Sequence, residues 1–251
     1  MSTTLVFANQ KGGVGKTTSV ANVGAFMAEA GKRVLLVDFD PQGNLSSSMG
    51  VDQNKPGIYE AISERADVLS TVQETAQHDL LVIASNINLT GASVELIEQE
   101  NREFFLKKTL EKAKSNWDYI LIDCPPSLGI LTINGLTAAD FVAIPLQCEY
   151  FALEGLSLLL QTIKKIQQGT NPDLQIAGIM FTMYDSRTRL SQEVVHEVSG
   201  YFGDKIFRTI IPRNVRLSEA PSHSVPVNLY DAGCVGALSY KKLSEEVIGR
   251  V

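Results

Sequence analysis

A glycine-rich stretch near the N-terminus, KGGVGKTT at residues 11–18, constrains the fold more than any other segment of this chain. A short apolar run, Leu5–Asn9, precedes it, and a helix-like pattern from Ser19 to Ala30 follows it. A strand, a glycine-rich turn and a helix in this order are typical of a phosphate-binding loop, in which backbone N–H groups and a helix N-terminus hold an anion. In such a loop Lys16 reaches the β- and γ-phosphates of a nucleotide, and Thr17 offers its hydroxyl to Mg²⁺.

The loop departs from the usual pattern G-x-x-x-x-G-K-[ST] at its first position. Gln10 stands where that pattern has its first glycine, and a second lysine, Lys11, precedes Gly12 and Gly13. The alternative interpretation is an ordinary glycine turn with two solvated lysines. The flanking strand and helix favour the phosphate-binding loop, because the motif is informative only in that context.

Strand-like and helix-like segments alternate along the rest of the chain. This alternation predicts an α/β fold: a mostly parallel, twisted sheet with helices on both faces. Further strands are predicted at residues 34–38, 80–84, 119–123, 141–145, 176–181 and 207–212, and helices near residues 58–62, 92–114, 156–163, 190–198 and 236–249. Because no long linker or internal repeat is present, we expect one domain over residues 1–251.

Aspartates end two of the predicted buried strands. Asp38 and Asp123 each follow four apolar residues, and Asp40 lies two residues beyond the first of them. Ligands of open α/β sheets bind outside the carboxyl ends of the strands, so these side chains are expected near the phosphates. Asp123 fits a Walker B acid that helps to hold Mg²⁺, and Asp40 can orient an attacking water. For Asp38, a strand-end cap and a role near the metal are equally open.

Composition excludes several classes of protein. Hydrophobic residues make up 44% of the chain and charged residues 20%, without an apolar run long enough to cross a bilayer. The first predicted strand begins so early that we expect no signal peptide. The three cysteines, Cys124, Cys148 and Cys234, form no close pair, which argues against disulfides and zinc.

The charge is unevenly distributed. The formal net charge of −6 does not favour binding to nucleic acid by the molecule as a whole. Residues 187–216, however, hold six Lys or Arg against three Asp or Glu. A local basic surface on an acidic body is therefore expected.

Five motifs in a fixed order resemble the ParA/Soj chromosome-partition ATPases. Lys-Gly-Gly-x-Gly-Lys-Thr is the deviant Walker A loop of the wider family that also contains MinD and nitrogenase reductase. The five matching segments span residues 8–18, 37–44, 122–128, 147–155 and 211–222. The resemblance covers nearly the whole chain and implies a P-loop NTPase fold. One departure lies at Ala232–Gly236, where the family commonly has a basic Pro-Arg-Ser-Arg-Gly stretch.

The resemblance also implies a function and a set of site residues. Family members bind ATP with Mg²⁺, hydrolyse it slowly, form an ATP-dependent homodimer, hold nonspecific double-stranded DNA and respond to a ParB-type partner. The implied location is the cytoplasm, on the nucleoid, without stable membrane association. The residues implied to contact the nucleotide are Lys11, Gly12, Gly13, Val14, Gly15, Lys16, Thr17 and Thr18, with Pro212, Arg213 and Asn214 beside the adenine.

The resemblance further assigns individual roles. Lys11 crosses to the nucleotide of the partner subunit and is catalytic together with Lys16 and Asp40. Thr17 and Asp123 hold Mg²⁺. Arg187 and Arg216 match arginines on the DNA-facing side of the dimer.

Three other functions stay open at this point. A MinD-like membrane-cycling ATPase needs an exposed amphipathic C-terminal helix, but Tyr240, Leu243 and Val247 give only a narrow apolar stripe. An electron-transfer protein needs two suitably placed cysteines per subunit. A non-hydrolysing scaffold is disfavoured because the catalytic set is complete. The sequence leaves open the organism, the cargo, the partner's identity and filament formation.

Overall fold

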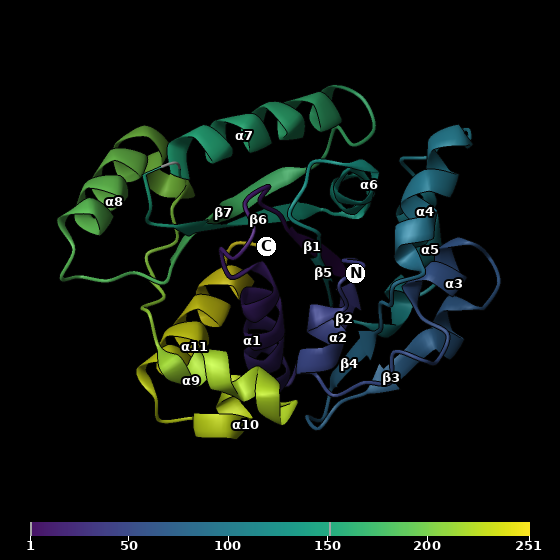
Figure 1. The fold of residues 1–251 in the computed structure, drawn as a ribbon, viewed down its shortest axis with the longest axis horizontal. Coiled ribbons are helices and arrows are strands. Elements are labelled where there is room, and N and C mark those ends of the chain that lie inside the picture. The colour runs from purple at the N-terminus through teal and green to yellow at the C-terminus, as the bar shows by residue number, and fades with distance from the viewer. Residues whose placement is uncertain (1, 151) are drawn as a thin grey trace.

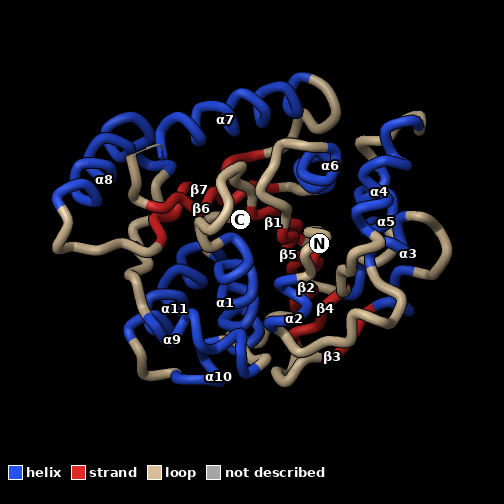
Figure 2. Tube along the Cα trace, viewed as in Figure 1, coloured by secondary structure: helices blue, strands red, loops and turns tan. Residues whose placement is uncertain are grey.

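The computed structural model describes residues 2–150 and 152–251. These residues form a seven-stranded sheet in the order β3-β4-β2-β5-β1-β6-β7 (Figures 1 and 2). Every neighbouring pair is parallel except β3 and β4, so the predicted fold class is confirmed. The strands are β1 (Thr3–Phe7), β2 (Val34–Asp38), β3 (Val72–Glu74), β4 (Leu80–Ile83), β5 (Tyr119–Asp123), β6 (Phe141–Gln147) and β7 (Gln175–Thr182).

Helices cover both faces of this sheet (Figure 1). The helices α1 (Lys16–Glu29), α2 (Asn44–Ser48), α9 (Val215–Glu219), α10 (Val227–Asp231) and α11 (Val235–Ile248) lie on one face. The helices α3 (Ile58–Ile62), α4 (Leu89–Glu95), α5 (Phe105–Glu111), α6 (Ile130–Ala138), α7 (Ala152–Gln168) and α8 (Arg189–Phe202) lie on the other. Short 3₁₀ turns are η1 (Val68–Thr71), η2 (Leu96–Glu98), η3 (Lys114–Asn116), η4 (Gly203–Lys205) and η5 (Ala220–His223).

The central strands carry apolar side chains on both faces, because each face packs against helices. All five residues of β2 are buried, and so are the last four of β1 and of β5. The strand register places Phe7 beside Asp123 and Asp38 beside Asp123. The carboxyl ends of β1, β2 and β5 therefore meet at one point, from which the glycine-rich loop and the turn after Asp38 both leave.

The helix predicted over residues 92–114 is wrong as a single element. The structure divides this stretch into α4, η2, an irregular segment, α5 and η3. Asn134 of α6 contacts the irregular segment and the start of α5. Its Oδ1 accepts from the Leu106 N–H at the start of α5, and its Nδ2 donates to the Arg102 carbonyl. A side chain 28 residues from Leu106 thus fixes the start of α5 and the irregular segment before it.

The strand predicted over residues 207–212 is also absent. This segment runs alongside β7. The Phe207 N–H donates to the Ile179 carbonyl, and the Ile211 N–H donates to the Phe181 carbonyl. Between these two bonds the Glu246 carboxylate of α11 accepts the N–H groups of Arg208 and Thr209. Because a side chain takes those donors, no continuous ladder forms.

Candidate functional site

The phosphate loop, residues 10–18, leaves the end of β1 and turns into α1. Gly13 and Gly15 have φ of 73° and 83°, a region in which an L-residue with a Cβ is strained, so both positions require glycine. Gly15 is also the N-cap of α1 and makes no side-chain cap, which leaves the first N–H groups of the helix open toward the loop. Such a helix end attracts an anion.

Lys16 points its ammonium group back into the loop. The residue is 7% exposed, and its Nζ donates to the Lys11 carbonyl at 3.1 Å. Burial lowers the pKa of Lys16, while Asp123 and Asp40 act in the opposite direction. A buried cation surrounded by turned-in backbone is prepared for phosphate, whose charge replaces the lost solvation.

Thr17 and Asp123 form the oxygen pair expected for a magnesium site. The Thr17 hydroxyl donates to Asp123 Oδ2 at 2.6 Å, and the other carboxylate oxygen, Oδ1, is buried without a protein partner. Burial, followed by the nearby charge of Asp38, raises the pKa of Asp123 well above its usual range. No cluster of three or more His, Cys, Asp or Glu suited to a metal occurs among the described residues. This donor set fits Mg²⁺, which takes few protein oxygens and completes its shell with water and phosphate.

Asp38 is a structural anchor, a role that the sequence left undecided. Its Oδ2 accepts from both the N–H and the hydroxyl of Ser46 at 2.7 Å, which ties β2 to α2. The Ser46 Oγ in turn accepts from Ser85 N–H, beyond the end of β4. Burial raises the pKa of Asp38 to about 6, although the Ser46 bonds oppose the shift. Sequence reasoning missed Ser46, since nothing local marks it.

Asp40 lies at the edge of the same site. It is 7% exposed, its Oδ1 accepts from Gln42 N–H, and its own N–H donates to Asp38 Oδ1. A cavity of about 510 Å³ is lined by Asp40 together with Gly12, Gly13, Gly15, Lys16, Thr17 and Thr18. The structure therefore brings the predicted loop and the predicted water-positioning acid into one cavity large enough for a nucleotide.

A second cavity, of about 180 Å³, adjoins the first. It is lined by Pro212, Arg213 and Asn214, and both cavities share Gly15 and Thr18 in their walls. The segment implied to lie beside adenine is thus next to the phosphate loop. Within residues 12–18, Val14 alone does not line the first cavity: its side chain is buried elsewhere and its carbonyl accepts from the Thr182 hydroxyl.

Comparison with known proteins identifies the family. An AAA domain family model matches residues 2–176. The chromosome-partitioning ATPase Soj of Treponema pallidum is 60% identical over 250 residues, covering 100% of this chain and 98% of that protein. The sporulation initiation inhibitor protein Soj of Bacillus subtilis is 52% identical over 249 residues, covering 98% of each. The chain belongs to the ParA/Soj family of chromosome-partitioning ATPases.

A solved structure supports the same fold. The cobyrinic acid a,c-diamide synthase of Mycobacterium smegmatis, with bound ADP and magnesium, superposes with a TM-score of 0.85. It is 40% identical and covers 98% of this chain and 93% of its own. The resemblance deduced from the five motifs is therefore confirmed, as is the P-loop NTPase fold. One residue of the fourth motif, at position 151, lies outside the described residues.

Within this ParA/Soj-family chain, Lys11 contacts Glu149 of its own chain. The Lys11 Nζ and Glu149 Oε2 form an ion pair, and the Lys11 N–H donates to Asn9 Oδ1. Both side chains of the ion pair are partly exposed. To reach a partner subunit, Lys11 would have to break its ion pair with Glu149. The sequence did not predict this ion pair.

The two arginines predicted to face DNA lie on adjoining segments of the ParA/Soj-family fold. Arg187 follows β7, and Arg216 lies on α9. A single β-bridge joins Tyr184 to Pro212, so the loop that carries Arg187 runs beside the segment that leads into α9. Arg187 is paired with Asp185, and Arg216 with both Glu219 and Asp231.

Two of the alternative functions lose support. Cys124 and Cys148 are buried, so they are core residues rather than surface ligands of a bridging cluster. The apolar stripe of α11 packs against the body, with Tyr240, Leu243 and Val247 each at most 1% exposed. The Tyr240 hydroxyl also lies 3.0 Å from the Ser19 Oγ of α1. Within the described residues, no helix combines the length and apolar character needed to span a bilayer.

Proposed function

We propose that this chain is a dimeric, slowly hydrolysing ATP switch that holds nonspecific DNA in its ATP state and moves DNA with a ParB-type partner. Membership of the ParA/Soj family makes it an ATP hydrolase with a role in chromosome partitioning. The observation that carries the nucleotide site is the Thr17–Asp123 pair, whose second carboxylate oxygen is buried without a partner beside the phosphate loop.

The residues of the site divide the chemistry between them. Gly13, Gly15 and the start of α1 bind the phosphates, and Lys16 offsets their charge. Thr17 and Asp123 would hold Mg²⁺, which neutralises charge that develops on the phosphate oxygens. Asp40 orients the water that attacks the γ-phosphate, since a carboxylate at the rim of the cavity can accept a proton from it.

The proposed switch acts as one ATPase domain over residues 1–251. Lys11 leaves Glu149 and reaches the nucleotide of the partner subunit when two chains close around ATP, while Pro212, Arg213 and Asn214 contact the adenine. Arg187 and Arg216 of both subunits then contact DNA phosphates. Phosphate contacts carry no sequence information, so binding is nonspecific. The proposed location is the cytoplasm, on the nucleoid.

The test measures the rate of ATP hydrolysis with and without duplex DNA and with the candidate ParB-type protein added. A slow basal rate that depends on Mg²⁺ and rises when DNA and partner are both present supports the proposal. A rate that ignores both DNA and partner contradicts the partition switch while leaving the ATPase assignment intact. Removal of Mg²⁺ by EDTA is the control for the metal-dependent step.

A further inference from the structure

The arginine surface, defined as Arg187, Arg213 and Arg216, is surrounded by carboxylates of the same chain. The Arg187 guanidinium makes a two-point contact with Asp185, from Nε to Oδ1 at 2.9 Å and from Nη2 to Oδ2 at 2.7 Å. The Asp185 Oδ1 also accepts the Arg187 N–H. Arg187 remains 86% exposed over its side chain, so solvent and ligands reach it freely.

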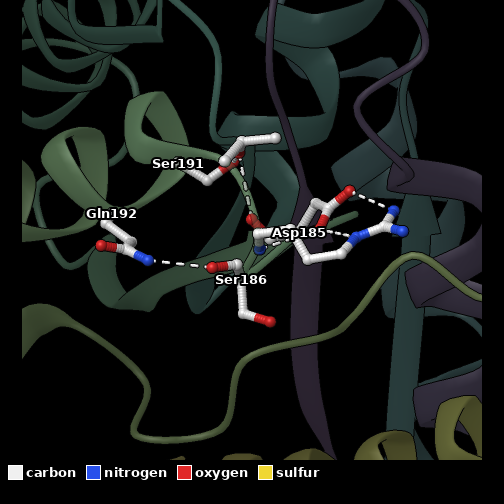
Figure 3. Close-up of polar contacts among 6 residues, drawn as sticks. Asp185, Ser186, Ser191 and Gln192 are labelled. Atoms are coloured by element: carbon white, nitrogen blue, oxygen red, sulfur yellow. Dashed lines mark hydrogen bonds and ion pairs between the residues drawn. The ribbon is translucent and has the colours of Figure 1, made fainter.

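The loop around Asp185 is held in place by further bonds. Figure 3 shows Ser186 bonded to Gln192 near the start of α8, and the Thr188 hydroxyl beside Asp185 also lies 2.7 Å from Ser191 Oγ. Thr188 Oγ1 donates to the Asp185 carbonyl, and Gln192 Nε2 donates to the Ser186 carbonyl. Bonds to Arg187 lower the pKa of Asp185 to about 2, and the charge of Arg213 adds to the shift. Asp185 is therefore a fixed negative charge at neutral pH, placed beside two arginines.

Arg216 is held in the same manner from two directions. Its Nη1 lies 2.8 Å from Glu219 Oε2 on α9, and its Nε lies 3.2 Å from Asp231 Oδ2 at the end of α10. Tyr230 also donates to Glu219, which fixes that carboxylate. Three arginines thus share their surface with three carboxylates, none of which falls within the basic segment counted from the sequence.

We propose that Asp185 and Asp231, with Glu219, are internal counter-ions that compete with DNA phosphates for Arg187 and Arg216 and so keep DNA affinity low. This inference rests on the proposed DNA binding. Arg187 exchanges its contact with Asp185, and Arg216 its contacts with Glu219 and Asp231, for phosphate contacts, and exposed ion pairs are weak enough to exchange. A single chain gains little from that exchange, whereas a dimer with two arginine surfaces neutralises twice as many phosphates.

The chain offers a closely matched control. Asp118 accepts the N–H of Arg33 and makes a two-point contact with its guanidinium, as Asp185 does with Arg187. The pKa of Asp118 is likewise lowered to about 2 by its bonds to Arg33. Asp118 precedes β5, however, at the amino ends of the strands, whereas the nucleotide site lies at their carboxyl ends. Asp118→Asn and Asp185→Asn therefore change the net charge and break the same kind of pair at two distant places, while an amide oxygen can still accept the backbone N–H.

The experiment titrates two unrelated DNA duplexes against the wild-type chain, Asp185→Asn, Asp231→Asn and Asp118→Asn, with a non-hydrolysable ATP analogue. Because each exposed pair is worth a few-fold in an equilibrium constant, two per dimer predict about five- to twentyfold tighter binding for Asp185→Asn and a similar gain for Asp231→Asn. The gain should shrink as salt rises, since exposed charges are screened. Asp118→Asn should bind like wild type.

Every outcome bears on the inference. If the wild type binds DNA and Asp185→Asn, Asp231→Asn and Asp118→Asn all bind with the wild-type affinity, the inference is overturned. The proposed function then still stands. Absence of DNA binding by the wild type and by both Asp185→Asn and Asp231→Asn overturns the proposed DNA binding together with the inference. Binding that appears only when Asp185 or Asp231 is replaced supports the inference in its strongest form.

Discussion

The phosphate loop and the arginine surface both lie at the carboxyl ends of the strands and hold their charges in opposite ways. At the loop, Lys16, Asp38 and Asp123 are buried, and each faces a small, fixed set of partners. At the arginine surface, the side chains are exposed and paired with carboxylates that solvent also reaches. The first region is built around charges removed from water, and the second around charges left in it.

This difference determines which region can switch. A buried charge that loses its partner costs several kcal/mol, so the loop keeps one geometry until a nucleotide offers a replacement. An exposed ion pair is worth at most about 1 kcal/mol, so its arginine can move to a phosphate at small cost. Substitutions at the loop should therefore produce all-or-none effects, and substitutions at the surface should produce graded, salt-dependent ones.

The largest effect is expected from Asp40→Ala. Removal of the carboxylate that orients water should lower turnover by about 100-fold or more while ATP binding and dimerisation persist. Steady-state hydrolysis and nucleotide binding measure the two separately. Asp52→Ala is the control, because Asp52 also accepts an N–H two residues ahead, from Asn54, in an exposed turn. Wild-type turnover by Asp40→Ala would show that another group positions the water.

Gly12→Val tests whether a second chain approaches the phosphate loop. A Cβ at Gly12 would lie 3.8 Å from the Pro126 Cβ, an ordinary contact, so the chain itself leaves room for a Cβ at this position. We expect the variant to bind nucleotide as a monomer and to form no ATP-dependent dimer, because the added side chain keeps a partner backbone away. Light scattering with a non-hydrolysable ATP analogue measures this. A dimer of normal affinity would contradict the assignment.

Arg216→Glu tests the exposed region. Each dimer would lose two phosphate contacts, which should lower DNA affinity by about 100-fold and reduce the slope of log affinity against log salt by about 2. Dimerisation should persist. Arg187→Glu should act in the same direction with a smaller effect, and Arg33→Glu at the amino ends of the strands is the charge-matched control. Gel shifts across a salt series decide the matter, and unchanged binding by both surface variants would place the DNA contact elsewhere.

The smallest effect is expected from Ser46→Ala, which tests the support behind the loop. The change removes the hydroxyl that joins Asp38 to the Ser85 N–H, at a cost of about 1–3 kcal/mol. The melting temperature should fall by about 2–10 °C, measured by circular dichroism. Ser48→Ala loses only a bond to the Leu45 carbonyl in the same helix and is the control. Equal melting temperatures for the two variants would remove the proposed anchor.

Local pattern was sufficient to predict much of this protein. The phosphate loop, the acids at strand ends and the alternation of strands and helices depend on neighbours within a few residues, and the register of β1, β2 and β5 brings these acids together. The family resemblance singled out Pro212, Arg213 and Asn214 as adenine contacts, which stays a prediction; the structure places them in a cavity that Gly15 and Thr18 also line. Short-range spacing carries such information because each motif folds around its own backbone.

Tertiary structure alone decided the partners of those residues. Asn134 fixes the start of α5 within the segment predicted as one helix over residues 92–114, and Glu246 takes donors that a strand at residues 207–212 would need. Glu149 pairs with Lys11 across 138 positions. Carboxylates from outside the basic segment, Asp185, Glu219 and Asp231, pair with its Arg187 and Arg216. A hydrogen bond or ion pair between distant segments leaves no period or spacing in the chain, because packing rather than local geometry sets which side chains meet.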